Sequence, residues 1–132
     1  MTEHPESVEA VAHQVRAALE TADLSALSDV LDPNVRWGPP GDPSPPCQTR
    51  EQVIAWYSRA KESGATAQVS EIVVLGNRIL VGLAVTGTRS AAQSGGQAAR
   101  WQLLTVRAGL VVDIVGFDQR SEAVAHAEVA DE

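Results

Sequence analysis

The spacing of apolar residues changes once along this chain of 132 residues, and this change constrains the fold more than any other feature. Up to about Gly64, apolar residues recur every three or four positions, which is the period of an amphipathic helix. From about Gln68 onward they follow a period of two, and glycine turns separate the runs. Helices followed by strands predict an α+β domain whose helices pack on one face of an antiparallel sheet.

Three helices are expected in the first half of the chain, over Pro5 to Ala22, Asp23 to Asp32, and Thr49 to Gly64. Asp23 is a good N-cap for the second helix, which should end before Pro33 because the residue before a proline avoids helical geometry. Thr49 and Gln52 form a capping box at the start of the third helix, and Gly64 is its stop signal.

Five strands are expected, at Asn34 to Trp37, Gln68 to Leu75, Arg78 to Arg89, Ala98 to Arg107 and Leu110 to Asp118. The turns between the last four are expected at Gly76-Asn77, Ser94-Gly95-Gly96 and Ala108-Gly109. A short helix from Arg120 to Glu128 should end the chain. The length and the lack of a linker or repeat predict one domain over residues 1–132.

The composition excludes several classes of function. A net charge of −7 disfavours binding to nucleic acid or to an anionic membrane surface, since both require clustered Lys and Arg. No apolar run approaches the roughly 20 residues of a membrane span, and no secretory signal is recognised, so a cytoplasmic location is expected. Neither glycine-rich phosphate loop pattern is present, and no cofactor is expected.

Cys47 is the only cysteine, which rules out an internal disulfide and a cysteine-based zinc cluster. It lies near the start of the third helix, whose dipole could lower the pKa of the thiol, but no histidine is close in sequence to act as its base. Glu122 and His126 are spaced to share one helix face, yet two ligands do not make a metal site, so no metal is expected.

Both faces of the last two strands are apolar, whereas three helices can cover only one face of the sheet. An exposed apolar sheet face of this width usually marks an interface. The sequence therefore predicts a homodimer built through the outer sheet face, with the residues Trp101, Leu103, Val111, Val115 and Phe117 in the interface.

Three stretches in this order resemble the nuclear transport factor 2-like superfamily: "VRAALETADLSALSDVLDPNVRW", "TREQVIAWY" and "RAGLVVDIVGFD". This superfamily has a cone-shaped, curved antiparallel sheet packed against three N-terminal helices, and it includes ketosteroid isomerases and SnoaL-like polyketide cyclases. The resemblance covers nearly the whole chain and implies a cone-shaped cavity. It also implies that the proline-rich stretch "GPPGDPSPPC", Gly38 to Cys47, forms part of the cavity rim. The prolines could instead simply keep a long surface loop from fraying.

The catalytic residues of ketosteroid isomerases are absent at the matching positions. Gly38 stands where the isomerases carry a proton-shuttling aspartate, and Val15 and Gln102 replace the tyrosine and aspartic acid of their oxyanion hole. SnoaL-like cyclases place an acid-base aspartate in the last strand, where this chain has Gly116. Asp118 lies two residues further on and on the same strand face, so it is the candidate base. Alternatively, Asp118 caps the terminal helix.

Four residues are expected to bind a ligand: Trp37, Trp56, Tyr57 and Gln102. Trp37 stands where the family presents side chains to ligand, although a core position would also suit it. Gln102 lies on the inner sheet face among apolar residues, where a side-chain amide is costly to bury without a partner. A ligand oxygen, Tyr57 or a water would satisfy it.

The sequence thus predicts a protein with a cavity for a small apolar molecule, such as a polyketide, steroid or terpenoid-like compound. If it is an enzyme, an isomerase, cyclase or epoxide hydrolase that needs no cofactor is expected, with Asp118 as the base. The alternative is a dimeric interaction module without enzymatic activity, in which Trp37 and Trp56 fill the cone. A cavity below about 300 Å³ would favour that alternative.

Overall fold

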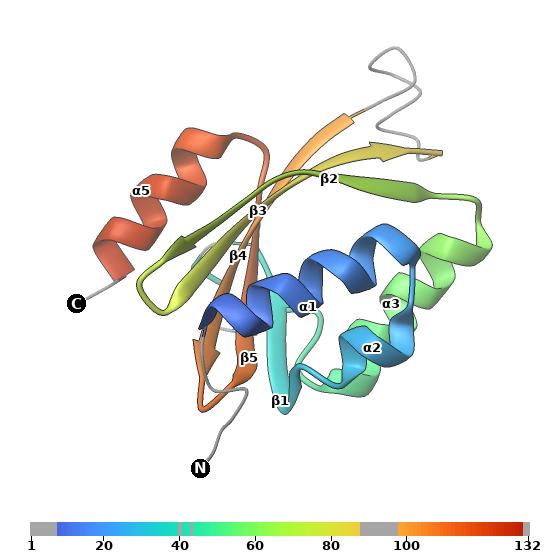
Figure 1. Cartoon of the computed structure of the whole chain (residues 1–132), viewed down its shortest axis with the longest axis horizontal. Coiled ribbons are helices and arrows are strands. Elements are labelled where there is room, and N and C mark those ends of the chain that lie inside the picture. The colour runs from blue at the N-terminus through green and yellow to red at the C-terminus, as the bar shows by residue number, and fades with distance from the viewer. Residues whose placement is uncertain (1–7, 40, 43, 88–97, 131–132) are drawn as a thin grey trace.

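A computed structural model describes residues 8–39, 41–42, 44–87 and 98–130. In these ranges the helices are α1 (Val8–Thr21), α2 (Leu24–Ser28), α3 (Arg50–Glu62) and α5 (Arg120–Ala130). The strands are β1 (Leu31–Gly38), β2 (Thr66–Leu75), β3 (Arg78–Thr86), β4 (Ala98–Arg107) and β5 (Leu110–Phe117). The turn expected at Ser94-Gly95-Gly96 lies outside the described residues. The α+β fold class is confirmed: three N-terminal helices pack on one face of a curved sheet (Figure 1).

The strands form one sheet in the order β1-β5-β4-β3-β2. Strands β2 to β5 are the expected antiparallel meander, but β1 pairs in parallel with β5, so the sheet is mixed. This pairing sets Trp37 opposite Ile114 and Gly38 opposite Val115. The chain thereby brings the end of β1 and the end of β5 together at one side of the helical layer.

The helix expected to reach Asp32 is shorter than predicted, and β1 starts earlier. Helix α2 ends at Ser28, and Leu31 and Pro33 belong to the strand. A proline is tolerated there because β1 is an edge strand, where a missing N–H breaks no ladder. The strand conformation also buries Leu31 and Val35 fully in the core.

The helix caps form as the sequence predicts. The Asp23 carboxylate accepts a hydrogen bond from the Ala26 N–H at the start of α2. The Thr49 hydroxyl accepts from the Gln52 N–H at 3.2 Å, and the Gln52 amide oxygen accepts from the Gln48 N–H at 2.7 Å. These bonds fix where α3 begins and therefore how it presents Trp56 and Tyr57.

Two apolar clusters hold the fold, one on each face of the sheet. The inner cluster joins α1, α2 and α3 to the sheet, and its most deeply buried members include Val11, Val15, Leu31, Val35, Val53, Ile79, Val81 and Val111. The outer cluster joins the sheet to α5 and consists of Leu80, Leu103, Val115, Phe117, Ala123 and Ala127. Small alanines on α5 let the helix approach the sheet closely.

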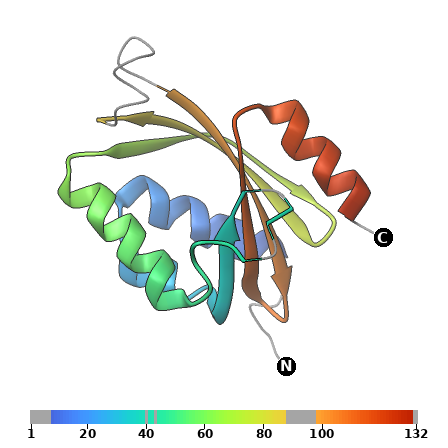
Figure 2. The ribbon, with the colours of Figure 1, turned by 180° about the vertical axis from the view of Figure 1, so that it is seen from behind.

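The interpretation that the outer face is uncovered is wrong, because α5 packs on it (Figure 2). Leu103, Val115 and Phe117 are buried within a single chain, and Trp101 is partly buried beside them. Glu71 of β2 and Arg120 of α5 form a two-pronged ion pair, with N–O distances of 2.9 and 2.8 Å, that ties the start of this helix to the sheet edge. The homodimer stays a prediction, but these side chains are not freely available to form it.

Val111 lies on the inner face rather than the outer one. Thr105 pairs with Asp113 but Val106 pairs with Val111, so Val112 is an extra residue in β5. Such a bulge reverses the alternation of side chains along a strand. The strict period of two predicted from the sequence therefore fails here, as it also does at Ser70 of β2, where Val69 pairs with Leu83 and Glu71 with Gly82.

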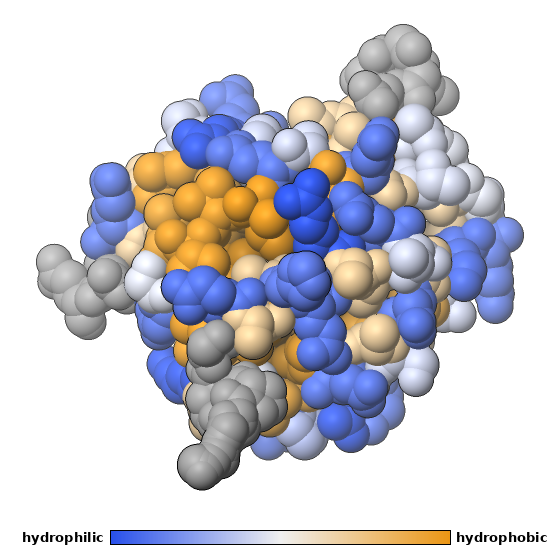
Figure 3. Space-filling view, viewed as in Figure 1, coloured by the Kyte–Doolittle hydropathy of each residue, from blue (hydrophilic) through white to orange (hydrophobic). Residues whose placement is uncertain are grey.

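The exposed apolar surface lies elsewhere than predicted. In the view of Figure 1, apolar residues gather over the end of the β2–β3 hairpin between α5 and α1 (Figure 3). Val73, Val74 and Leu75 of β2 are each partly exposed there. β2 is an edge strand of the sheet, the position at which strands can pair with another chain.

Candidate functional site

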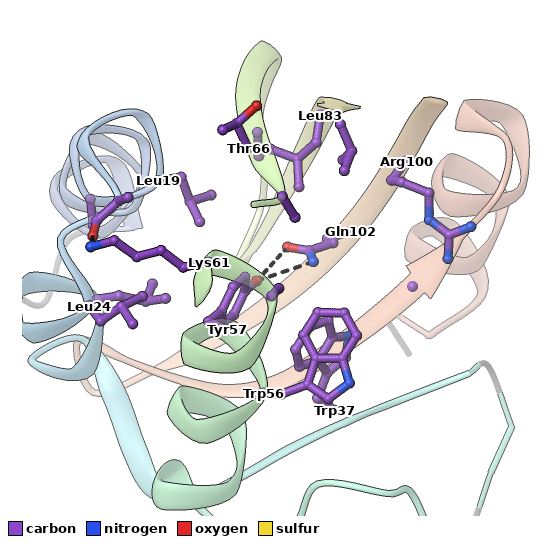
Figure 4. A pocket seen from close by; sticks show the side chains of 18 of the residues that line it. Leu19, Leu24, Trp37, Trp56, Tyr57, Lys61, Thr66, Leu83, Arg100 and Gln102 are labelled. Carbon is purple, nitrogen blue, oxygen red and sulfur yellow. Dashed lines mark hydrogen bonds between the residues drawn. The ribbon is translucent and has the colours of Figure 1, made fainter. Parts of the chain in front are cut away.

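A cavity of about 890 Å³ lies between the three N-terminal helices and the inner face of the sheet. The helices and the strand of the first half, α1, α2, β1 and α3, all contribute to its lining. Residues of β2 to β5 complete it. Trp37, Trp56, Tyr57 and Gln102 all line it, so the structure brings the four predicted ligand-binding residues into one cavity (Figure 4). Most other lining residues are apolar, among them Leu19, Leu24, Leu27, Leu83 and Val85.

Three aromatic side chains form one wall of the cavity. The rings of Trp37 and Tyr57 stack with centroids 5.1 Å apart and planes 19° apart. The ring of Trp56 meets Trp37 edge-on at 4.7 Å and is 47% exposed. Because these rings pack on one another, they leave the cavity open rather than filling it. The alternative in which Trp37 and Trp56 fill the cone is therefore not supported, because the cavity has a volume of about 890 Å³.

Tyr57 and Gln102 form the polar centre of the cavity. The Tyr57 hydroxyl lies 3.2 Å from the Gln102 amide nitrogen and 3.4 Å from its amide oxygen, so it can accept from the first or donate to the second. Of the partners considered for Gln102, the structure shows Tyr57. Burial raises the pKa of Tyr57 to about 12, although the bond to Gln102 opposes the rise, so the phenol is protonated at neutral pH.

The end of the proline-rich loop, Pro45 to Cys47, packs back onto the end of β1. The Trp37 N–H donates to the Cys47 carbonyl at 2.9 Å, and the Cys47 N–H donates to the Trp37 carbonyl at 3.3 Å. Pro45 and Pro46 pack against Gly38, where an added Cβ would lie 2.5 Å from the Pro45 Cβ. Pro39 and Pro46 line the cavity, which supports the interpretation of this loop as a rim.

Cys47 is a buried thiol in the cavity wall. Burial raises the pKa of the Cys47 thiol, and the nearby Arg59 only partly offsets this. The expectation that the helix dipole could lower this pKa is therefore not met. A protonated, buried thiol acts as a small apolar group in the lining rather than as a nucleophile.

Asp118 is not among the lining residues. Its carboxylate accepts a hydrogen bond from a guanidinium N–H of Arg100 at 2.7 Å, and its side chain is 79% exposed. Arg100 does line the cavity, so Asp118 touches the site through this partner. Gly116, which stands where the cyclases carry their acid, faces the cavity with the Trp37 indole nitrogen 4.0 Å from where a Cβ would lie.

Sequence reasoning missed three charged lining residues: Glu20, Lys61 and Arg100. Arg100 could have been found, since it is two residues before Gln102 and so shares the inner strand face. Glu20 and Lys61 lie near helix ends, where periodicity alone does not distinguish the cavity from solvent. Lys61 donates to the Ala22 carbonyl at 3.1 Å and so ties α3 to the end of α1.

Two further features of the described residues bear on the expected partners. Among the described residues, no group of three or more His, Cys, Asp or Glu side chains is arranged to hold a metal ion. Within the same ranges, none of the helices has both the length and the apolar character needed to cross a membrane.

The comparisons with known proteins agree with this architecture. The chain is similar to a candidate polyketide cyclase from Sinorhizobium meliloti, with 20% identity, a TM-score of 0.64, and coverage of 81% of this chain and 93% of that one. It is similar to a candidate ketosteroid isomerase from Kribbella flavida, with 16% identity, a TM-score of 0.69, and coverage of 86% and 78%. It is also similar to TerC, co-crystallised with polyporic acid, with 13% identity, a TM-score of 0.64, and coverage of 95% and 99%. At these identities the likeness shows a shared fold.

A search of curated proteins found no match. The family profile of the SnoaL-like domain, in contrast, matches residues 11–114, which is well over half of the chain. The match begins within α1, includes α2, α3 and strands β1 to β4, and ends within β5 before Gly116. The chain therefore belongs to the SnoaL-like domain family, as its resemblance to the nuclear transport factor 2-like superfamily implied.

Proposed function

We propose that this protein binds a small, largely apolar molecule in the cavity bounded by Trp37, Trp56, Tyr57 and Gln102. The observation that carries the proposal is the cavity itself, at about 890 Å³ and with a mainly apolar lining. This volume lies within the range typical of small-molecule sites. The neutral Tyr57–Gln102 pair supplies a donor and an acceptor at its centre, suited to a carbonyl or hydroxyl oxygen of the ligand.

The aromatic wall favours a ligand with a flat ring system. The Trp37–Tyr57 stack and the exposed edge of Trp56 present ring faces and edges to one side of the cavity. Aromatic side chains contribute large contact areas with little loss of conformational freedom. TerC, a structure of the same fold, was co-crystallised with polyporic acid, which agrees with a small-molecule ligand in this chain.

The test is a fluorescence titration with N-phenyl-naphthylamine, a neutral apolar probe that brightens in apolar sites. We expect saturable binding to the wild-type protein at one site per chain. Gly116→Phe should weaken binding by at least about tenfold, because its side chain would project into the cavity. Its melting temperature should change little, since an added Cβ meets only the Trp37 indole nitrogen, 4.0 Å away.

Ala99→Phe is the matched control. Ala99 is an exposed residue of β4 that does not line the cavity, so the same aromatic group there should leave probe binding unchanged. If the probe does not bind, or if both variants bind it as the wild type does, the proposed cavity function is wrong.

A second candidate function is acid–base isomerisation or cyclisation with Asp118 as the base. The observation in its favour is the contact between Asp118 and Arg100, because a ligand that reaches Arg100 also approaches the carboxylate. Once a turned-over substrate is found, Asp118→Asn should abolish turnover and retain binding. Unchanged turnover would remove Asp118 from the mechanism.

A further inference from the structure

Arg100 is a cation that lines the cavity from the inner face of the sheet. It stands two residues before Gln102 on β4, and it pairs across the sheet with Leu83 of the inner cluster. Figure 4 shows Arg100 on the same strand as Gln102, at the edge of the cavity, with its guanidinium group turned toward the end of β5. An apolar ligand bound in this cavity therefore shares it with a guanidinium group.

The partner of Arg100 is held weakly. Asp118 binds one guanidinium nitrogen at 2.7 Å, but the side chains of Arg100 and Asp118 are 48% and 79% exposed. Exposed ion pairs of this kind contribute little to stability, because water competes for both charges. The bond also uses only one of the five N–H donors of the guanidinium. A second anion can therefore share Arg100 or replace Asp118 at low cost.

The other charged lining residues are already engaged. The Glu20 carboxylate accepts a hydrogen bond from Arg16 at 3.4 Å, and the Lys61 ammonium donates to the Ala22 carbonyl at 3.1 Å. The described lining residues thus include two cations and one anion, within a chain whose net charge is −7. The cavity runs against the overall charge of the protein, and Arg100 is its most adaptable cation.

We infer that the ligand is an acid: a flat apolar ring system carrying a carboxylate, a sulfonate or an ionised enol that binds Arg100 in place of Asp118. This inference rests on the proposed function and specifies its ligand class. The rings lie against the Trp37–Tyr57 wall, and an oxygen of the ligand reaches the Tyr57–Gln102 pair. Arg100 is suited to this role because its planar fork can bind both oxygens of an acid group.

The test compares two probes that share one scaffold. Anilinonaphthalene sulfonate is N-phenyl-naphthylamine with an added sulfonate, so the difference in their affinities isolates the contribution of the negative charge. We expect Arg100→Gln to weaken the sulfonate probe about tenfold, the effect of losing one charge-assisted hydrogen bond, and to weaken the neutral probe much less. Asp118→Asn should strengthen the sulfonate probe a few-fold, because it removes the competing carboxylate.

Arg107→Gln is the matched control, since it removes the same charge from an exposed position on the same strand, outside the cavity lining. It should leave both affinities unchanged. Equal weakening of both probes by Arg100→Gln would show a structural role and overturn the inference, as would an unchanged affinity for the sulfonate. If the neutral probe binds but Arg100→Gln does not change the affinity for the sulfonate probe, the inference is refuted and the proposed function stands. Failure of both probes refutes the proposed function.

Discussion

Alkaline titration should leave the phenol of Tyr57 protonated until about pH 12, because burial disfavours its anion. Tyr57 is the only tyrosine in the chain, so the absorbance of phenolate reports on this one group. A tyrosine in the unfolded chain ionises near pH 10. A rapid pH jump, read before the protein unfolds, should therefore show a midpoint well above that value.

The same shift predicts how stability depends on pH. The pKa of Tyr57 is higher in the folded state, so its contribution is fully present below about pH 10 and is lost between about pH 10 and 12, where the unfolded chain ionises first. A shift of two units corresponds to a loss of about 3 kcal/mol in the free energy of unfolding. Tyr57→Phe should remove this part of the alkaline decline.

Two controls make the titration decisive. In concentrated urea the midpoint should return to about pH 10, as for any exposed tyrosine. Gln102→Leu should raise the midpoint further in the folded protein, because the bond to Gln102 is the contact that lowers this pKa. A folded-state midpoint near pH 10 would mean that the Tyr57 hydroxyl is exposed to water. The Tyr57–Gln102 pair would then not form the polar centre of the cavity.

Gly82→Val should destabilise the protein by about 2 to 3 kcal/mol, the usual cost of forcing extra atoms into a packed site. The ring of Trp101 lies across Gly82 on the outer sheet face. A Cβ at Gly82 would lie 2.9 Å from Cε3 of that ring and 2.9 Å from the Ser70 hydroxyl, so the ring would have to move. For a chain of this size, each kcal/mol lowers the melting temperature by roughly 4 °C.

A double-mutant cycle separates this clash from other effects of valine. In a Trp101→Leu background, Gly82→Val should cost much less, because the smaller side chain leaves room for the added methyl groups. Ala84→Val, two residues along the same strand and partly exposed, should be close to neutral. Equal costs for Gly82→Val with and without Trp101 would show that the ring is not the reason for the glycine.

Local signals explain which parts of the fold could be predicted. The caps at Asp23 and Thr49 and the turn at Gly76-Asn77 act over a few residues, so the sequence shows them directly. The placement of Gln102 on the inner face needs only the alternation of a strand. Its partner, Tyr57, is 45 residues away and was one of several options until the fold brought the two together.

The predictions that were wrong concern features that depend on tertiary contacts. Pro33 ends a helix by local rules, but on an edge strand it breaks no hydrogen bond, and burial of Leu31 and Val35 favours the strand. The extra residue Val112 has no marker in the sequence, and it moves Val111 to the inner face. The packing of α5 on the outer sheet face was not predicted, because a short helix with only small apolar residues gives a weak amphipathic pattern.

The glycine at position 116 has a consequence for how such a cavity can evolve. Every glycine codon is one nucleotide away from a codon for aspartate or glutamate. Gly116 already faces the cavity beside the Trp37 indole, with room for a side chain. A single point mutation would therefore place a carboxylate in the cavity, at the position that the resemblance matches to the acid of the SnoaL-like cyclases, without any remodelling of the fold.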